Sequence, residues 1–289
     1  MPIYLETNAL RKLTNYQCDD FAFTSIFSIF ELISGITEDE YEVRKACLQR
    51  IKKQKLAIRG PMIDKAYMQF WGETGYNKLA YKSIMKIFNH ILKSKKFSDI
   101  SDFCISIQVG DNPPYSTNAL EWVRSKDKNL TQLITKTDML FENEDVEYLQ
   151  KVFNRDGIAG FARHFWQRYY ETRIDENRLA HVEPFVGEDE TEQVRKHIDS
   201  MFSKYNFKLF AIAQAAIFAK AYFINGNKQN KNNPSDLLHL LYLSEKDILI
   251  SNDKIYQDIK LACEDFNHIH LENEKQLSDL LINRSQSNT

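Results

Sequence analysis

Four acidic side chains stand beside apolar segments of this chain. Glu6 ends the apolar run that begins at Ile3, and Glu31 lies inside a largely apolar helical segment. Asp236 precedes another apolar run, and Asp253 follows a third. Carboxylates in apolar surroundings cost folding free energy unless a positive charge lies among them, so these acids predict a bound cation. Their oxygens are ligands of the kind that Mg²⁺ and Mn²⁺ prefer.

The helix predicted around Glu31 carries one stripe of small or polar residues. Thr24, Ser28, Glu31 and Gly35 recur at helical spacing, and apolar residues fill the other positions. We expect this stripe to form the wall of a pocket.

Three of the acids also have simpler interpretations. Asp236 suits a helix N-terminus, Asp253 suits a turn, and Glu6 suits a strand end in solvent. The metal hypothesis depends on all the acids falling at matching positions in one fold.

Five short β-like segments are expected to position these acids. The predicted strands lie at residues 3–5, 21–23, 55–59, 247–251 and 267–271. Helical patterns separate most of them, so the sequence predicts an α/β fold with a central parallel sheet. In such a sheet, acids at the carboxyl ends of neighbouring strands share one crevice.

The middle of the chain has a different character. Strand signals are weak there, and several helical patterns occur, at residues 77–95, 145–153, 157–174 and 192–202. We therefore predict an α/β core split between residues 1–60 and 226–289. An all-helical insertion is predicted at residues 61–225.

Composition limits the class of protein. The formal net charge of −2 argues against general attraction to nucleic acid, so any such binding requires local patches. Four scattered cysteines without a CxxC pair indicate reduced thiols. The longest apolar stretch, residues 207–224, is interrupted by Lys208, Gln214 and Lys220, as in a buried helix. We expect a cytoplasmic protein without a membrane partner.

Two segments supply local positive charge. Residues 44–59 contain seven Lys or Arg and no acid, and residues 74–98 also contain no acid. The residues predicted to bind nucleic acid are Lys52, Lys53, Lys55, Arg59, Lys78, Lys82 and Lys86. A solvated lysine face is the alternative interpretation, although such faces normally include paired glutamates.

A third segment combines arginines with aromatic rings. Residues 161–173 suit contact with single-stranded RNA or, as the more ordinary explanation, a helix that packs its rings inward.

Four short motifs follow one another in a defined order. Glu6-Thr7-Asn8 follows the first strand, and Glu31 lies in the next helix. An Asp-apolar-apolar-His motif spans 236–239, and Ser-Asn-Asp at 251–253 ends a later strand. Together they resemble the PIN domain family of metal-dependent ribonucleases. The resemblance covers residues 1–60 and 233–275, about a third of the chain.

The resemblance implies a fold and an activity. The fold is a three-layer α/β/α arrangement with strand order 3-2-1-4-5. The activity is hydrolysis of RNA phosphodiester bonds by Mg²⁺ or Mn²⁺, held by the catalytic acids Glu6, Glu31, Asp236 and Asp253. Polar support is expected from Asn8, Ser251 and Asn252. Since the family includes many bacterial toxins, a toxin or defence role is open, with a protein inhibitor or a second copy of the chain as partner.

One residue departs from the family pattern. Glu6 stands where the family usually has Asp, and its oxygens reach about 1.5 Å further from the backbone. The metal site is therefore expected to be shifted, weakened or selective for Mn²⁺. Two alternatives follow: a non-catalytic PIN-like module that binds RNA or protein through a degenerate site, or a structure-specific DNA nuclease.

Overall fold

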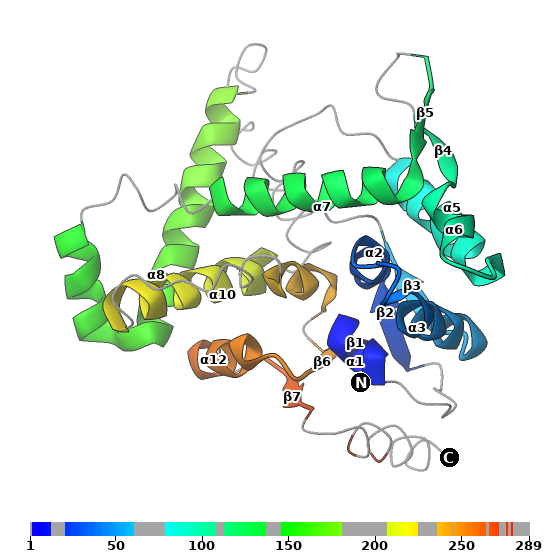
Figure 1. The fold of residues 1–289 in the computed structure, drawn as a ribbon. Coiled ribbons are helices and arrows are strands. Elements are labelled where there is room, and N and C mark those ends of the chain that lie inside the picture. Colours follow the sequence, from blue (N-terminus) through cyan, green and yellow to red (C-terminus); the bar gives the residue numbers. More distant parts are fainter. Residues whose placement is uncertain are drawn as a thin grey trace. The chain divides into compact units, whose positions relative to one another are not determined.

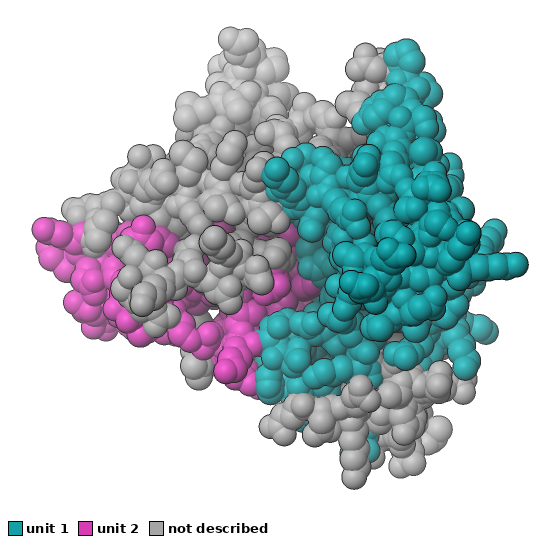
Figure 2. Space-filling model, in the orientation of Figure 1, with its two compact units in different colours: residues 1–134, 246–253, 267–289 teal, residues 135–245, 254–266 magenta. Residues whose placement is uncertain are grey.

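Contacts divide the protein into two compact units (Figure 2). Unit 1 comprises residues 1–134, 246–253 and 267–289, and unit 2 comprises residues 135–245 and 254–266. The split core and the insertion predicted from the sequence have other boundaries, and that division stays a prediction. The computed structural model describes residues 2–12, 21–60, 79–107, 113–136, 146–180, 207–224, 236–244, 246–263, 266–271, 276 and 279.

Unit 1 is built on a parallel sheet of five strands, ordered β3-β2-β1-β6-β7. The strands are β1 (Ile3–Leu5), β2 (Ala22–Ser25), β3 (Ala57–Arg59), β6 (Ile248–Ser251) and β7 (His268–His270). All five segments predicted as strands are therefore confirmed as strands. With the helices described next, the unit is α/β and compatible with a three-layer α/β/α fold.

The three central strands explain why their sequences are so apolar. Every residue of β1, β2 and β6 is buried, whereas the edge strands β3 and β7 are partly exposed. A parallel sheet covered on both faces requires side chains that can be buried on both sides of each strand. The polar residues that interrupt this pattern are therefore the ones that need an explanation.

Helices of unit 1 pack beside this sheet (Figure 1). The contacting helices α1, α2, α3 and α5 form one group. Their bounds, with those of α6 and α7, are Thr7–Lys12, Ile26–Ser34, Tyr41–Lys53, Leu79–Lys93, Ser98–Ser101 and Ala119–Lys136. Helix α2 is capped by Ser25, whose Oγ accepts a hydrogen bond from the Ser28 N–H at 3.0 Å. The helices predicted around Glu31 and at residues 77–95 are confirmed.

The prediction that residues 61–225 are all helical was wrong. Strands β4 (Cys104–Ile107) and β5 (Tyr115–Asn118) form an antiparallel pair in this segment. Side chains of β4 alternate between exposed and buried, with Ile105 and Ile107 buried. That alternation is the period of a strand, but four residues give too short a pattern to distinguish it from a loop.

Unit 2, in its described part, is helical. Its elements are α8 (Val146–Ala180), α10 (Phe207–Ala219), the π-helical turn η2 (Lys220–Ile224), the 3₁₀ helix η3 (Leu237–Tyr242) and α12 (Lys254–Ala262). Helix α8 merges the segments predicted at 145–153 and 157–174 across a kink at Gly157, where φ is 66°. The helix predicted at 192–202 lies outside the described residues.

Aromatic rings form the core of unit 2. Phe161 is fully buried and lies 4.6 Å, centroid to centroid, from Phe165. Phe165 and Trp166 pack against the same cluster, which includes Phe218. For these rings, inward packing is therefore the correct interpretation of the arginine-aromatic segment. No described helix is both long enough and apolar enough to cross a membrane.

Candidate metal centre

Glu6 begins the candidate site at the point where β1 ends and α1 begins. The residue is buried, with 2 % of its surface exposed. Its Oε2 accepts a hydrogen bond from the Asn8 N–H at 2.8 Å, and its Oε1 accepts one from the Ala9 N–H at 3.1 Å. The longer glutamate side chain thus folds back onto the free amides of the first helical turn. Glu6 does not lie in solvent.

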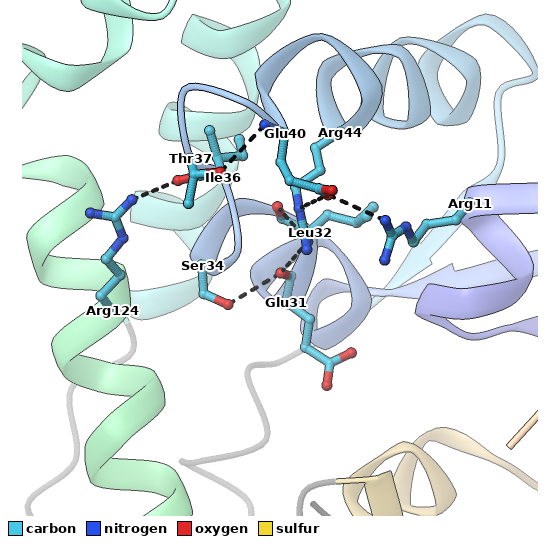
Figure 3. A network of polar contacts seen from close by, with 9 residues as sticks. All are labelled: Arg11, Glu31, Leu32, Ser34, Ile36, Thr37, Glu40, Arg44 and Arg124. Carbon is cyan, nitrogen blue, oxygen red and sulfur yellow. Dashed lines mark hydrogen bonds and ion pairs between the residues drawn. The ribbon is translucent and has the colours of Figure 1, made fainter. Parts of the chain in front are cut away.

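Thr7 connects the start of α1 to Glu31. The Thr7 hydroxyl donates a short hydrogen bond to Glu31 Oε2. The backbone carbonyl of Glu31 is fixed separately, because it accepts hydrogen bonds from Ser34 Oγ at 3.1 Å and from Arg44 at 3.3 Å. In Figure 3 the Glu31 carboxylate points away from Ser34 and Arg44. The polar network of Figure 3 therefore holds the backbone of α2 in place, while the Glu31 carboxylate contacts Thr7 outside this network.

Gly35 is required by this anchor. A Cβ atom at Gly35 would lie 2.5 Å from Cζ of Arg44, so only glycine admits the guanidinium so close to the end of α2. Arg44 also forms an ion pair with Glu40 at 3.1 Å, and Arg11 reaches the same carboxylate at 3.2 Å (Figure 3).

Asn8 connects the start of α1 to Asp253. Its amide Nδ2 donates to Asp253 Oδ2 at 2.7 Å. The Ser251 hydroxyl donates to the same oxygen at 3.3 Å, and the Asp253 N–H donates to Ser251 Oγ at 3.0 Å. Two of the three residues predicted as polar support of the site, Asn8 and Ser251, thus contact Asp253. Asn252, the third, has its Oδ1 buried without a hydrogen-bond partner among the described residues.

The first turn of α1 therefore gathers three of the predicted acids. It holds Glu6 through backbone amides, Glu31 through Thr7 and Asp253 through Asn8. All three lie at the carboxyl end of the sheet, where α/β proteins bind ligands.

Asp236, the fourth predicted acid, belongs to unit 2. It stands directly before η3, but its side chain forms no capping hydrogen bond with that helix. Its backbone carbonyl accepts a hydrogen bond from the Tyr256 hydroxyl at 2.5 Å. Its convergence with the acids of unit 1 stays a prediction.

The polar stripe around Glu31 serves the packing of α2 onto the start of the chain. Thr24, which belongs to β2 and not to the helix, donates to the Leu5 carbonyl at 2.8 Å. Ser28 is fully buried and lies 3.1 Å from the Tyr4 hydroxyl. With the Glu31 contact to Thr7, these polar residues all meet residues 4–7. At these positions the residues expected to form a pocket wall instead form polar contacts between residues 24–31 and residues 4–7.

Asp127 is an acid that sequence reasoning missed. It lies on α7, where burial and then the nearby negative charge of Glu31 raise the pKa of its carboxyl, while a hydrogen bond with Ser34 lowers it. In the sequence it stands between Lys126 and Lys128, as expected for a solvated helix position, and no short motif contains it.

The residues predicted to bind nucleic acid fall into separate places. Lys52, Lys53 and Lys55 are exposed at the end of α3 and just before β3, and Lys82 and Lys86 are exposed on α5. Lys78 lies outside the described residues. Arg59 instead forms an ion pair with Asp247, whose side chain is fully buried, and its Cζ lies 3.4 Å from the ring centroid of Phe23. This arginine has a structural contact that the sequence pattern did not indicate.

The donor atoms suit a hard divalent cation, but their present orientation is set by hydrogen bonds. Carboxylate, amide and hydroxyl oxygens are ligands for Mg²⁺ or Mn²⁺. Among the described residues, no three His, Cys, Asp or Glu side chains converge closely enough to hold a metal ion. A cation at this place requires the carboxylates to turn from their donors toward one point.

Comparison with known proteins gives no relative on which to base a function. No family model matches the chain, and no significant match was found among curated proteins or solved structures.

Proposed function

We propose that this protein is a divalent-metal-dependent nuclease, with RNA as its substrate. The observation that carries the proposal is the gathering of Glu6, Glu31 and Asp253 around the first turn of α1, at the carboxyl end of a parallel sheet. Glu6 and Glu31 lie near the start of the chain, whereas Asp253 is 245 positions beyond Asn8, which contacts it. The neutral side chains of Thr7 and Asn8 orient Glu31 and Asp253, as expected for carboxylates that serve as metal ligands.

The finer proposal for the fold is a PIN-like three-layer arrangement. The order β3-β2-β1-β6-β7 supports it, because it becomes 3-2-1-4-5 when the five strands are numbered along the chain. In this fold Asp236, which directly precedes η3, is proposed as the fourth acid.

Each side chain has a defined task in this proposal. Glu31, Asp236 and Asp253, with Glu6, would hold Mg²⁺ or Mn²⁺, which supplies an activated water and stabilises charge on the phosphate. Thr7 and Asn8 orient Glu31 and Asp253. The amides of α1 hold Glu6 at the end of β1, so that a glutamate can take the place of the usual aspartate.

The test compares Asp253→Asn with the wild-type protein. Labelled RNA, single-stranded DNA and branched DNA are incubated with Mn²⁺ or Mg²⁺, with EDTA as the metal-free reference. We expect cleavage of RNA in the wild type and a loss of about a thousandfold in the variant, because several kcal/mol of transition-state stabilisation depends on the metal. Preference for branched DNA would indicate a structure-specific DNA nuclease.

A matched control separates the site from a general effect of charge. Asp39 is exposed, and Asp39→Asn makes the same change of charge elsewhere on unit 1. Asp236→Asn should behave like Asp253→Asn, without loss of thermal stability. Full activity of both variants would contradict the assignment of these acids.

A second function is favoured by the hydrogen bonds of Glu6. Both of its oxygens accept backbone amides, which is the arrangement of a helix cap. This feature suits a non-catalytic PIN-like module that binds RNA or a protein partner. Calorimetric titration with Mn²⁺ distinguishes the two functions, because the non-catalytic module should bind no metal at millimolar concentration.

A further inference from the structure

Helix α5 carries a stripe of lysines on the face opposite its buried side. Lys82, Lys86 and Lys93 are exposed, and helical geometry places them within an arc of about 40°. Ile84 and Ile91, on the other side, are fully buried. His90 continues the four-residue spacing in the sequence. Its ring instead stacks on Phe103, with 3.7 Å between centroids, so it is not part of the stripe.

Two lysines of this stripe, Lys82 and Lys86, are unfavourable for the helix itself. Lys82 and Lys86 are like charges at i and i+4, which repel by about 0.2–0.5 kcal/mol. The first turn of α5 contains no acid to favour the helix dipole. In the part of the chain that the structure describes, none of these three lysines forms an ion pair. Helix stability therefore does not explain Lys82 and Lys86, whereas an anionic ligand would neutralise their charges.

The start of α5 lies at the carboxyl end of the sheet. Gly60 directly follows β3, and a Cβ atom there would lie 2.7 Å from the Tyr81 ring, one residue before Lys82. Helix α5 also contacts α2, the helix that carries Glu31.

The other group of predicted lysines lies at the opposite end of the sheet. Lys52 and Lys53 end α3, and Lys55 precedes the first residue of β3. Because the strands are parallel, this is the amino end, away from Glu6 and Asp253. The two groups carry the same charge but differ in their position relative to the candidate site.

We propose that Lys82, Lys86 and Lys93 bind the phosphate backbone of RNA and guide it to the acids at the carboxyl end of the sheet. The choice of RNA as the ligand rests on the proposed function. The stripe spans about 16 Å along α5, enough to contact more than one phosphate. Lysine heads on flexible stems suit such contacts, which do not depend on base sequence.

Two triple variants of the full chain test this proposal. One replaces Lys82, Lys86 and Lys93 by Gln, and the matched control replaces Lys52, Lys53 and Lys55 by Gln. Both remove three positive charges and keep good helix formers on the helices. Binding of a short labelled single-stranded RNA is measured by fluorescence anisotropy at several salt concentrations. EDTA is present, so that cleavage cannot interfere.

The α5 variant should lose about tenfold or more in affinity at physiological salt. The slope of log affinity against log salt should become shallower by about 2, since each phosphate contact contributes about 0.7. The control should lose clearly less in both quantities. Equal losses in the two variants would show attraction to overall charge and overturn the proposal, as would wild-type affinity in the α5 variant.

The outcome is separable from the nuclease test. If the wild type cleaves no RNA, the proposed activity is refuted. Loss of RNA binding in the α5 variant would still support RNA binding by the lysine stripe. Cleavage by the wild type with unchanged binding and cleavage by the α5 variant would refute the stripe alone. Equal binding of a labelled polyglutamate would assign the stripe to an acidic protein and overturn its assignment to RNA.

Discussion

Strand β6 has an acid at each end, and the protein holds the two acids differently. Asp247, before the strand, is fully buried and paired with Arg59. Asp253, after the strand, accepts hydrogen bonds from Asn8 and Ser251. A guanidinium cancels the charge of a carboxylate, whereas an amide or a hydroxyl orients the carboxylate and leaves its charge in place. The acid at the amino end is thus paired with a cation of the protein itself, and the acid at the carboxyl end contacts neutral donors, as the proposed metal site requires.

Removing Arg59 should produce the largest change in stability. Arg59→Gln leaves Asp247 buried without its cation, and we expect a loss of about 3 kcal/mol in the free energy of unfolding. The value lies at the low end of the usual range because Arg59 is 37 % exposed. Urea denaturation measures it, and adding Asp247→Asn should restore part of the loss. Unchanged stability with reduced RNA affinity would instead support the nucleic-acid role predicted for Arg59.

Removing Asn8 should affect metal binding more than stability. Asn8→Ala takes away the amide that orients Asp253, and a lost orienting contact typically costs about 10- to 100-fold in metal affinity. Calorimetry with Mn²⁺ measures this change. Asn89→Ala, at an exposed position of α5, is the matched control. If both variants bind Mn²⁺ equally well, the hydrogen bond to Asp253 does not serve a metal site.

Removing the Thr7 hydroxyl should have a smaller effect on the same site. Thr7→Val deletes one hydrogen bond to Glu31, worth about 0.5–1.5 kcal/mol, so Mn²⁺-dependent cleavage should fall by roughly two- to tenfold. Thr7→Ser keeps the donor and should restore most of the activity. Similar rates for the serine and valine variants would mean that Thr7 acts through packing and does not orient Glu31.

Asp127 gives the smallest predicted effect, and it depends on pH. Because burial and Glu31 raise the pKa of Asp127 in the folded protein, the folded state binds this proton more tightly than the unfolded chain does. Stability therefore falls as pH rises from the ordinary aspartate range through the raised pKa, and then levels off. Asp127→Asn should remove this cost, with a gain below about 1 kcal/mol at neutral pH and none in acid. Thermal unfolding across pH measures it, with Asp39→Asn as the control.

The sequence predicted the sheet well because the buried strands of a parallel sheet are apolar throughout. Residues 3–5 and 247–251 needed no tertiary information to be recognised as strands. The pair β4 and β5 was missed because β4 buries only one face and β5 has no buried residue, and four residues give too short a pattern to distinguish a strand from a loop. Its presence removes the all-helical description of residues 61–225.

The site was predicted only in part, because its contacts join distant segments. Glu6, which ends the first apolar run, and Asp253, which follows another apolar run, could be recognised from the sequence alone. Nothing local indicated that Thr7 would contact Glu31 or that Arg59 would cross Phe23 to reach Asp247. The raised pKa of Asp127 could not be predicted for the same reason, because Glu31 and Ser34, which act on it, belong to α2 and not to its own helix.

The pairing of β1 with β6 has a consequence for the order of events during synthesis. Asn8 and Asp253 are separated by 245 positions, and the central strand of the sheet lacks one neighbour until residues 248–251 exist. Contacts of such high sequence separation slow folding and leave apolar segments exposed in the nascent chain. Any activity that needs Glu6 together with Asp253 can therefore start only after Asp253 has left the ribosome.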